Sequence, residues 1–291
     1  MSPLIPGIVL PQTEIGNDPV VLRDFAQAAE ALGYRYLLAY DHVLGANPER
    51  PGGWRGPYTH QTPFHEPFVL FAYLAGLTTR LEFVTGILIL PQRQTALVAK
   101  QAAELDLLSG ERLRLGVGIG WNKVEYDALG MDFGSRGRRS EEQVRLLREL
   151  WSKPLVTYRG VVELIEDAGI NPLPNRVIPI WFGGEADAVL ERMARLGDGW
   201  IVNFMMPDEA AGYMERLRHY LAAAGRTPEN FGADIRVNLS RQPIDEWEAY
   251  LRGWRAIGAT HAALNLMGAG LKGPDDYIEP MRQFIAITRD V

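Results

Sequence analysis

Short apolar runs recur along the whole chain, and each is followed by a segment with helical spacing. The runs are rich in Val, Ile and Leu, as expected of strands that are buried on both faces. Alternation of such strands with helices is typical of βα units around a parallel sheet. Eight runs are predicted to be strands: Ile5–Leu10, Tyr36–Tyr40, Leu81–Ile87, Leu113–Gly118, Pro179–Gly183, Gly199–Asn203, Ile235–Leu239 and Ala262–Leu266.

The segments between these runs carry apolar residues three and four positions apart, which places those residues on one face of a helix. The longest apolar stretch, Pro67–Leu77, is too short to span a bilayer and has the spacing of a buried helix. Gly33 suits the C-cap of the first helix. Ser140 and Gln143 form a capping-box pattern, which predicts the start of another helix.

The eight units predict a single (β/α)8 barrel over residues 1–291. An open, doubly wound sheet of the Rossmann type is not favoured, because Leu10-Pro11-Gln12 after the first strand lacks the glycine-rich turn that binds pyrophosphate. Two connections are unusually long: Val43–Phe64 after the second strand, and Tyr158–Val177 after the fourth, where Val161–Ile165 suggests a hairpin. We expect both insertions to wall a pocket at the C-terminal ends of the strands.

Composition narrows the range of functions. The chain has 291 residues and 47% apolar content, which is enough for a large core, and its net charge of −6 gives no general attraction to nucleic acid or to an anionic membrane. The absence of Cys excludes disulfides and thiolate nucleophiles, and the five His residues show no metal-binding spacing, so no metal is expected. The first residues do not resemble a signal peptide, so we expect a cytoplasmic protein.

The second predicted strand ends in Tyr40-Asp41-His42, at the edge where a barrel keeps its catalytic groups. An imidazole exchanges protons near neutral pH, and a neighbouring carboxylate fixes its tautomer or accepts a ligand N–H. Asp41 and His42 are therefore candidate catalytic residues. An Asp that caps a turn beside a surface His would give the same dipeptide.

Glycines at the ends of three other strands indicate a ligand site. The third strand contains Thr85-Gly86-Ile87, and an interior strand glycine marks either a bulge, a close ligand approach or tight barrel packing. Gly118-Ile119-Gly120-Trp121 follows the fourth strand and would let a planar ligand lie against the backbone. Gly183-Gly184 before a helix suits a phosphate, although a tight turn would use the same residues.

Together, Asp41-His42, Thr85-Gly86-Ile87, GVGIGW with Glu125, and WFGG followed by DGW resemble the bacterial luciferase-like superfamily, and within it the branch that uses coenzyme F420, a deazaflavin. The resemblance covers residues 1 to about 205 with ordered motifs. It implies a cis peptide bond at Gly86-Ile87 behind the coenzyme ring. It also implies that Asp41 and the backbone near Gly118–Gly120 bind the coenzyme, and that Gly183 and Gly184 hold its phosphate.

The same resemblance implies that His42 faces the reactive ring carbon and manages the proton that accompanies hydride transfer to or from a small organic substrate. It also implies a homodimer. Trp121 stands where sugar-phosphate dehydrogenases of this branch have Glu, so a more apolar or planar substrate is expected. Two alternatives remain at this point: a monooxygenase that uses reduced FMN, and a carrier of the coenzyme without catalytic activity.

Overall fold

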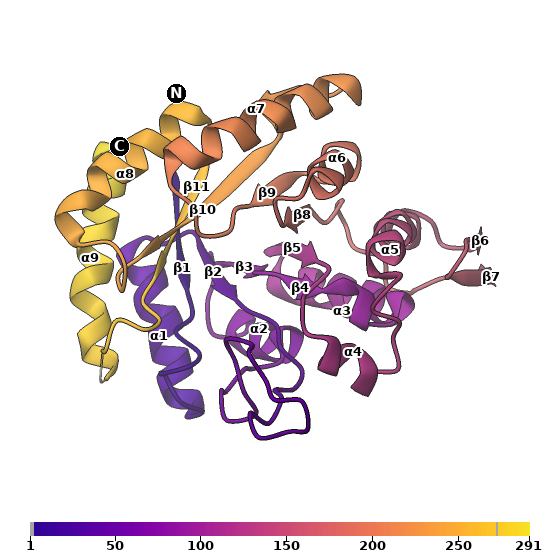
Figure 1. Cartoon of the computed structure of the whole chain (residues 1–291), viewed down its shortest axis with the longest axis horizontal. Helices are drawn as coiled ribbons and strands as arrows, with labels where there is room; N and C mark the ends of the chain where they lie inside the picture. Colours follow the sequence, from indigo (N-terminus) through magenta and orange to yellow (C-terminus); the bar gives the residue numbers. More distant parts are fainter. Residues whose placement is uncertain (1–2, 272) are drawn as a thin grey trace.

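The predicted strands form a closed ring of parallel strands in the computed structural model, which describes residues 3–271 and 273–291 (Figure 1). The order is β3-β2-β1-β11-β10-β9-β8-β5-β4, and β3 also pairs with β5, which closes the ring. The (β/α)8 fold is therefore confirmed. The strands of the ring are β1 (Ile5–Val9), β2 (Tyr36–Ala39), β3 (Glu82–Thr85), which is continued by β4 (Leu88–Ile89), β5 (Leu113–Gly118), β8 (Ile180–Gly183), β9 (Gly199–Ile201), β10 (Gly232–Asn238) and β11 (His261–Asn265).

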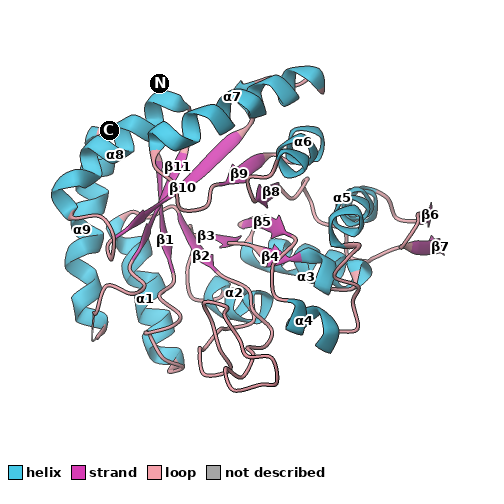
Figure 2. Ribbon diagram, in the orientation of Figure 1, coloured by secondary structure: helices cyan, strands magenta, loops and turns pink. Residues whose placement is uncertain are grey.

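Helices surround the ring, as Figure 2 shows. The apolar stripes face the strands, and Gly33 ends the first helix in the left-handed conformation at φ 102°, as predicted. Among the helices in the described part of the chain, none has the length and apolarity needed to cross a bilayer. The helices are α1 (Pro19–Leu32), α2 (Pro67–Ala75), α3 (Thr95–Ser109), α4 (Lys123–Ala128), α5 (Arg136–Ser152), α6 (Asp187–Leu196), α7 (Pro207–Ala223), α8 (Trp247–Ile257) and α9 (Pro274–Asp290).

The capping box predicted at Ser140 and Gln143 was wrong. Helix α5 begins four residues earlier, at Arg136, so Ser140 lies inside the helix. The Gln143 side chain instead donates to the Arg93 carbonyl and to Thr95 Oγ1, both at 3.0 Å. Tertiary packing of α5 against the start of α3 therefore uses the residues that the local pattern had assigned to a cap.

The second long insertion forms the expected hairpin, but our prediction that it walls the pocket was wrong. Strands β6 (Val156–Arg159) and β7 (Leu164–Ala168) pair antiparallel and project beyond α5 at the edge of the molecule (Figure 1). The Glu142 carboxylate of α5 accepts the backbone N–H groups of Val161, Val162 and Glu163 at the hairpin turn. Because the insertion follows α5 rather than β5, it leaves from the helix layer and not from the strand tips.

Glycines in the strands make room for two large aromatic side chains inside the barrel. A Cβ on Gly7 of β1 would lie 2.0 Å from the Tyr36 ring. A Cβ on Gly232 of β10 would lie 2.1 Å from the ring of Trp181, and one on Gly199 of β9 would lie 2.3 Å from that ring. Near the N-terminal ends of the strands, the interior of the barrel is therefore filled by a few bulky side chains, and glycines on the neighbouring strands make room for them.

This packing predicts the effect of two glycine substitutions. Gly232→Ala is expected to lower the free energy of unfolding by about 1–3 kcal/mol, because the added methyl group collides with Trp181. Gly212→Ala is the control, since Gly212 lies within α7 and a Cβ added there would have no atom within 4 Å. It should raise stability by about 0.5–1 kcal/mol. Urea unfolding followed by circular dichroism measures both, and equal midpoints for wild type and Gly232→Ala would contradict the expected collision.

Candidate active site

A cavity of about 460 Å³ lies at the C-terminal ends of the strands. Its walls come from the ends of β2, β5, β8 and β9, from the junction of β3 with β4, and from the middle of β10. Asp41 and Thr85 do not line this cavity. The other residues that the sequence predicted to bind a cofactor do line it: Gly86, Ile87, Gly118, Ile119, Gly120, Trp121, Gly183 and Gly184.

The junction of β3 and β4 is a bulge. The peptide bond between Gly86 and Ile87 is cis, as the family resemblance implied. Val84 pairs with Arg114, and Leu88 pairs with Val117, so four positions on this strand match three on β5. The extra residue turns the backbone toward the barrel axis, where it forms one wall of the cavity.

The Ile87 side chain covers the backbone of the two strands that face the bulge. A Cβ on Gly118 of β5 would lie 2.5 Å from Ile87 Cδ1, and a Cβ on Gly183 of β8 would lie 2.9 Å from Ile87 Cγ2. We expected these glycines to let a ligand touch the backbone directly. Instead they make room for Ile87, so a ring in the cavity would contact the side chain of Ile87 at this point.

Thr85, the residue before the bulge, contacts the neighbouring strand rather than the cavity. Its Oγ1 donates to the Gly116 carbonyl at 2.7 Å, and its side chain is fully buried. A Cβ on Gly116 would lie 1.9 Å from the Thr85 carbonyl oxygen. Thr85 therefore joins β3 to β5 at their closest approach.

The turn from β8 into α6 gives the cavity a polar end. Gly184 has a φ of 110°, a conformation that favours glycine, and the Trp200 indole donates to its carbonyl at 2.9 Å. The N-cap residue Ala186 has no side-chain acceptor for the first amides of α6. The start of this helix therefore presents N–H groups and the positive end of its dipole, which suit an anionic group.

A buried carboxylate positions His42. His42 Nδ1 lies 3.1 Å from Glu125 Oε1, although the two residues are 83 positions apart in the sequence. The backbone N–H groups of Val43 and Leu44 donate to the same oxygen, and Gln92 Nε2 donates to Glu125 Oε2 at 3.3 Å. An ionised carboxylate only accepts, so Nδ1 carries a proton and Nε2 is the atom left to exchange one.

The environment of Glu125 keeps it ionised. Burial raises the pKa of Glu125, but hydrogen bonds from His42, Gln92 and the Leu44 amide outweigh burial, so the pKa lies below its ordinary value. At neutral pH the side chain is therefore a fixed negative charge beside the imidazole.

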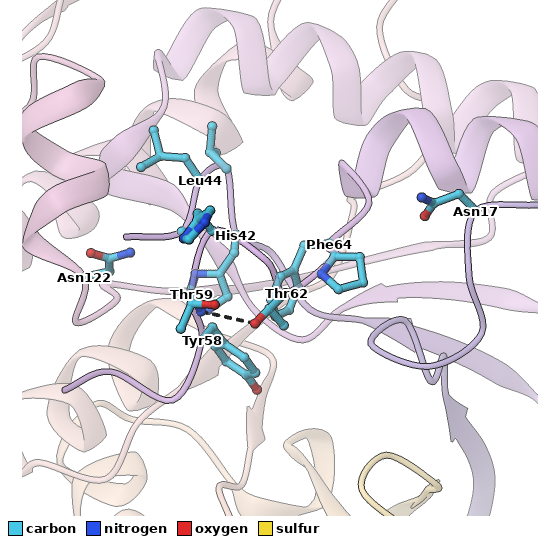
Figure 3. Close-up of a pocket in the computed structure, with 12 residues that line it drawn as sticks. Asn17, His42, Leu44, Tyr58, Thr59, Thr62, Phe64 and Asn122 are labelled. Atoms are coloured by element: carbon cyan, nitrogen blue, oxygen red, sulfur yellow. Dashed lines mark hydrogen bonds between the residues drawn. The ribbon is translucent and has the colours of Figure 1, made fainter. Parts of the chain in front are cut away.

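Two aromatic side chains from the loop of residues 40–66 and one from the turn after β5 enclose His42. The centroid of its ring lies 5.1 Å from that of Tyr58, 4.8 Å from that of Phe64 and 5.8 Å from that of Trp121. Figure 3 shows His42, Tyr58 and Phe64 around a second cavity of about 340 Å³, which Asn122 also lines. Trp121 lines the first cavity and Asn122 the second, so consecutive residues after β5 border the two cavities.

Asp41 faces away from both cavities. Its Oδ2 accepts the Ile89 backbone N–H at 3.0 Å, and its Oδ1 accepts Arg93 Nη2 at 2.8 Å. Burial raises the pKa of Asp41, although Arg93 and the Ile89 amide counteract that rise. Arg93 also bonds Glu66, the N-cap residue of α2. Asp41 thus joins the end of β2 to β4 and fixes the position of the bulge.

Two residues that matter to the site were not singled out in the sequence. Arg236 of β10 and Tyr40 after β2 both line the first cavity. A signal for Arg236 exists, because Asp234, Arg236 and Asn238 alternate with apolar residues in a strand that should be apolar on both faces. In the residues that the structure describes, no group of three or more metal-ligating side chains occurs.

Comparisons with known proteins agree with this architecture. A family model described as luciferase-like monooxygenase matches residues 8–276. An uncharacterised protein of Mycobacterium tuberculosis is 38% identical over 208 residues, which cover 69% of this chain and 72% of that protein. The FMNH2-dependent dimethylsulfone monooxygenase of Pseudomonas fluorescens is 31% identical over 233 residues, which cover 79% of this chain and 60% of the monooxygenase.

A solved structure of an F420-dependent secondary alcohol dehydrogenase, in complex with an F420-acetone adduct, superimposes with a TM-score of 0.79. The alignment covers 99% of this chain and 98% of the dehydrogenase, at 15% sequence identity, so the likeness is one of fold. Because the family model matches nearly the whole barrel, the chain belongs to the luciferase-like monooxygenase family.

Proposed function

We propose that this protein binds coenzyme F420 in the first cavity and transfers a hydride between the coenzyme and a small organic substrate. Its family places it among oxidoreductases and monooxygenases. One observation carries the finer proposal: the Gly86-Ile87 bulge lines one cavity, and His42, held by Glu125, lines a second cavity that is bordered by the next turn of the same strand ends.

The residues that line the cavity suit a deazaflavin. Ile87 and Ile201 offer apolar surface, and Trp121 and Phe204 offer aromatic surface, to a planar ring. The start of α6 suits the phosphate of the coenzyme side chain. When bound, the coenzyme would supply or accept a hydride at the central carbon of its ring. The protein would supply position and electric field.

His42 is the residue that we assign to proton transfer. Its Nε2 is the free nitrogen of a ring whose orientation Glu125 fixes, and the second cavity lies directly beside it. A substrate held there would contact the imidazole. The rings of Tyr58, Phe64 and Trp121 favour a planar or apolar substrate.

A second candidate is a monooxygenase that uses reduced FMN. The similarity to the dimethylsulfone monooxygenase of Pseudomonas fluorescens favours it, since that relative is FMNH2-dependent. The same cavity would accept a flavin ring, so the two candidates differ in coenzyme and in the use of oxygen.

Binding measurements distinguish the two coenzymes. We expect F420 to bind the purified protein and FMN to compete poorly, as measured by fluorescence titration with each coenzyme alone and in competition. Oxygen consumption by the protein with reduced FMN should stay at the level of reduced FMN without protein. Preferential FMN binding with oxygen uptake would establish the monooxygenase, and uptake of neither coenzyme would refute both candidates.

Replacement of His42 tests its assigned role. In His42→Ala, kcat should fall about hundredfold or more, because proton transfer by a positioned group contributes about 10²- to 10⁴-fold. The Kd for F420 should change only a few fold. His219→Ala is the matched control, since His219 lies exposed on α7. Loss of coenzyme binding in parallel with kcat would show that His42 holds the coenzyme rather than a proton.

Replacement of Glu125 should lower turnover. Glu125→Gln removes the ionised acceptor that orients the His42 ring through Nδ1, so kcat should fall while the Kd for F420 changes only a few fold. Asp127→Asn, on the exposed side of α4, is the control. An unchanged kcat would exclude Glu125 from positioning His42.

The same substitution has a consequence for stability. Because folding lowers the pKa of Glu125 from 4.5, its ionised form stabilises the fold above about that pH, and the contribution is lost as the pH falls through the lower folded value. Glu125→Gln should therefore lose less stability than wild type between neutral pH and the acid range. Urea midpoints measured across this range provide the test.

Exposed apolar residues support a homodimer, which we propose as the assembly. Helix α2 packs beside α3, and Val69, Leu97 and Leu108 on these helices are 69%, 52% and 70% exposed. Contiguous exposed apolar surface marks association sites. Light scattering should give twice the mass of one chain for wild type and for the control Val177→Glu, but a single-chain mass for Val69→Glu/Leu97→Glu. A single-chain mass for wild type would refute the dimer.

A further inference from the structure

Charged side chains lie inside the barrel next to the first cavity. Asp234 and Arg236 follow each other on the inner face of β10, and Arg114 reaches them from β5. Arg236 Nη1 donates to Asp234 Oδ1 at 2.9 Å, and Arg114 Nη1 lies 3.6 Å from Asp234 Oδ2. All three side chains are at most 5% exposed. Buried ions of this kind need compensation, because each has lost its hydration.

Aromatic residues hold this charge cluster in place. Tyr36 Oη donates to Asp234 Oδ1 at 2.6 Å, and the Arg114 guanidinium lies 4.5 Å from the ring centroid of Tyr36 and 4.5 Å from that of Trp181. The glycines that admit Tyr36 and Trp181 into the barrel therefore also fix Arg114. The positions of the charges are determined by the packing of the barrel.

Among its buried members the cluster has two positive charges and one negative charge. Two guanidinium groups share the Asp234 carboxylate, and Arg114 also lies 3.4 Å from Glu82, whose side chain is half exposed at the other end of the barrel. Arg236 pairs with Asp234 alone among the described carboxylates. Arg236 therefore has no carboxylate of its own, because its one partner is shared with Arg114.

The neighbouring titratable groups do not remove this excess. Burial and the nearby Arg114 hold the pKa of His261 well below its ordinary value, so this imidazole is neutral. Burial raises the pKa of Tyr36 well above its ordinary value and that of Tyr40 to about 12, so both hydroxyls stay protonated.

Arg236 lines the cavity. It is the basic residue among the described residues that do so, and Glu185, in the turn before α6, is the acidic one. Tyr40 lines the same cavity, and its buried hydroxyl lies beside the Arg236 guanidinium. A cation and a hydroxyl thus lie together on the inner wall.

We propose that Arg236 binds the anionic form of the coenzyme ring and so selects a ring that carries a negative charge. The inference rests on the proposed function, because it takes the first cavity as the coenzyme site. F420 carries a phenolic hydroxyl on its ring that ionises, whereas oxidised FMN has a neutral ring and becomes anionic only on reduction. A negative charge spread over a planar ring would give Arg236 a counter-charge in addition to the Asp234 carboxylate that it shares with Arg114.

The ionisation of bound F420 tests this directly, without turnover. Wild type and Arg236→Gln are saturated with F420, and the absorption band of the ionised hydroxyl is followed against pH. In wild type the bound hydroxyl should ionise at lower pH than in free F420. In Arg236→Gln its proton affinity should rise about tenfold or more, and Arg236→Lys, which keeps the charge, should stay close to wild type.

An additional variant controls for folding, and additional coenzymes test which ring Arg236 recognises. Arg236→Gln/Asp234→Asn removes both members of the ion pair, so it keeps the test valid if Arg236→Gln alone does not fold. 5-Deaza-FMN, which lacks the hydroxyl, should bind to wild type and Arg236→Gln with equal affinity. If FMN is the coenzyme, Arg236→Gln should weaken binding of reduced relative to oxidised FMN about tenfold.

The outcomes separate this inference from the function on which it rests. Binding of F420 with the same hydroxyl ionisation in wild type and in folded Arg236 variants would overturn the role of Arg236 alone. Failure of wild type to bind either coenzyme would overturn the proposed function and this inference together.

Discussion

The site depends on the space that glycine leaves on β5 and β8. Ile87 turns inward at the bulge, and its side chain occupies the positions that Cβ atoms on Gly118 and Gly183 would take. Any larger residue at either glycine would collide with the Ile87 side chain. The two glycines and the bulge therefore depend on one another, and together three strands that are far apart in sequence form one wall of the first cavity.

Much of the fold could be predicted from periodicity, because strands buried on both faces give apolar runs that a parallel barrel repeats eight times. The errors arose where tertiary packing overrides local pattern. Gln143 bonds Arg93 instead of capping a helix, and the hairpin of β6 and β7 belongs to the helix layer because α5 precedes it. Neither relationship is visible in the residues next to each motif.

The location of the candidate site could be predicted from topology, because parallel strands bring their C-terminal ends together at one end of a barrel. Asp41 and His42 are adjacent in sequence, yet His42 faces the second cavity and Asp41 binds Ile89 and Arg93. The partner of His42 is 83 positions away and gave no local signal. Arg236 was missed because it lies on the inward face of β10, and the interior of a barrel is expected to be apolar.

The carboxylate of Glu125 accepts from His42, from two amides that follow it and from Gln92. The His42 imidazole, the start of the loop of residues 40–66 and helix α4 are consequently joined at one carboxylate, so none of them can shift independently of the others. Transplanting that loop between family members, with Glu125 left in place, is the modular route to new substrates that the architecture offers.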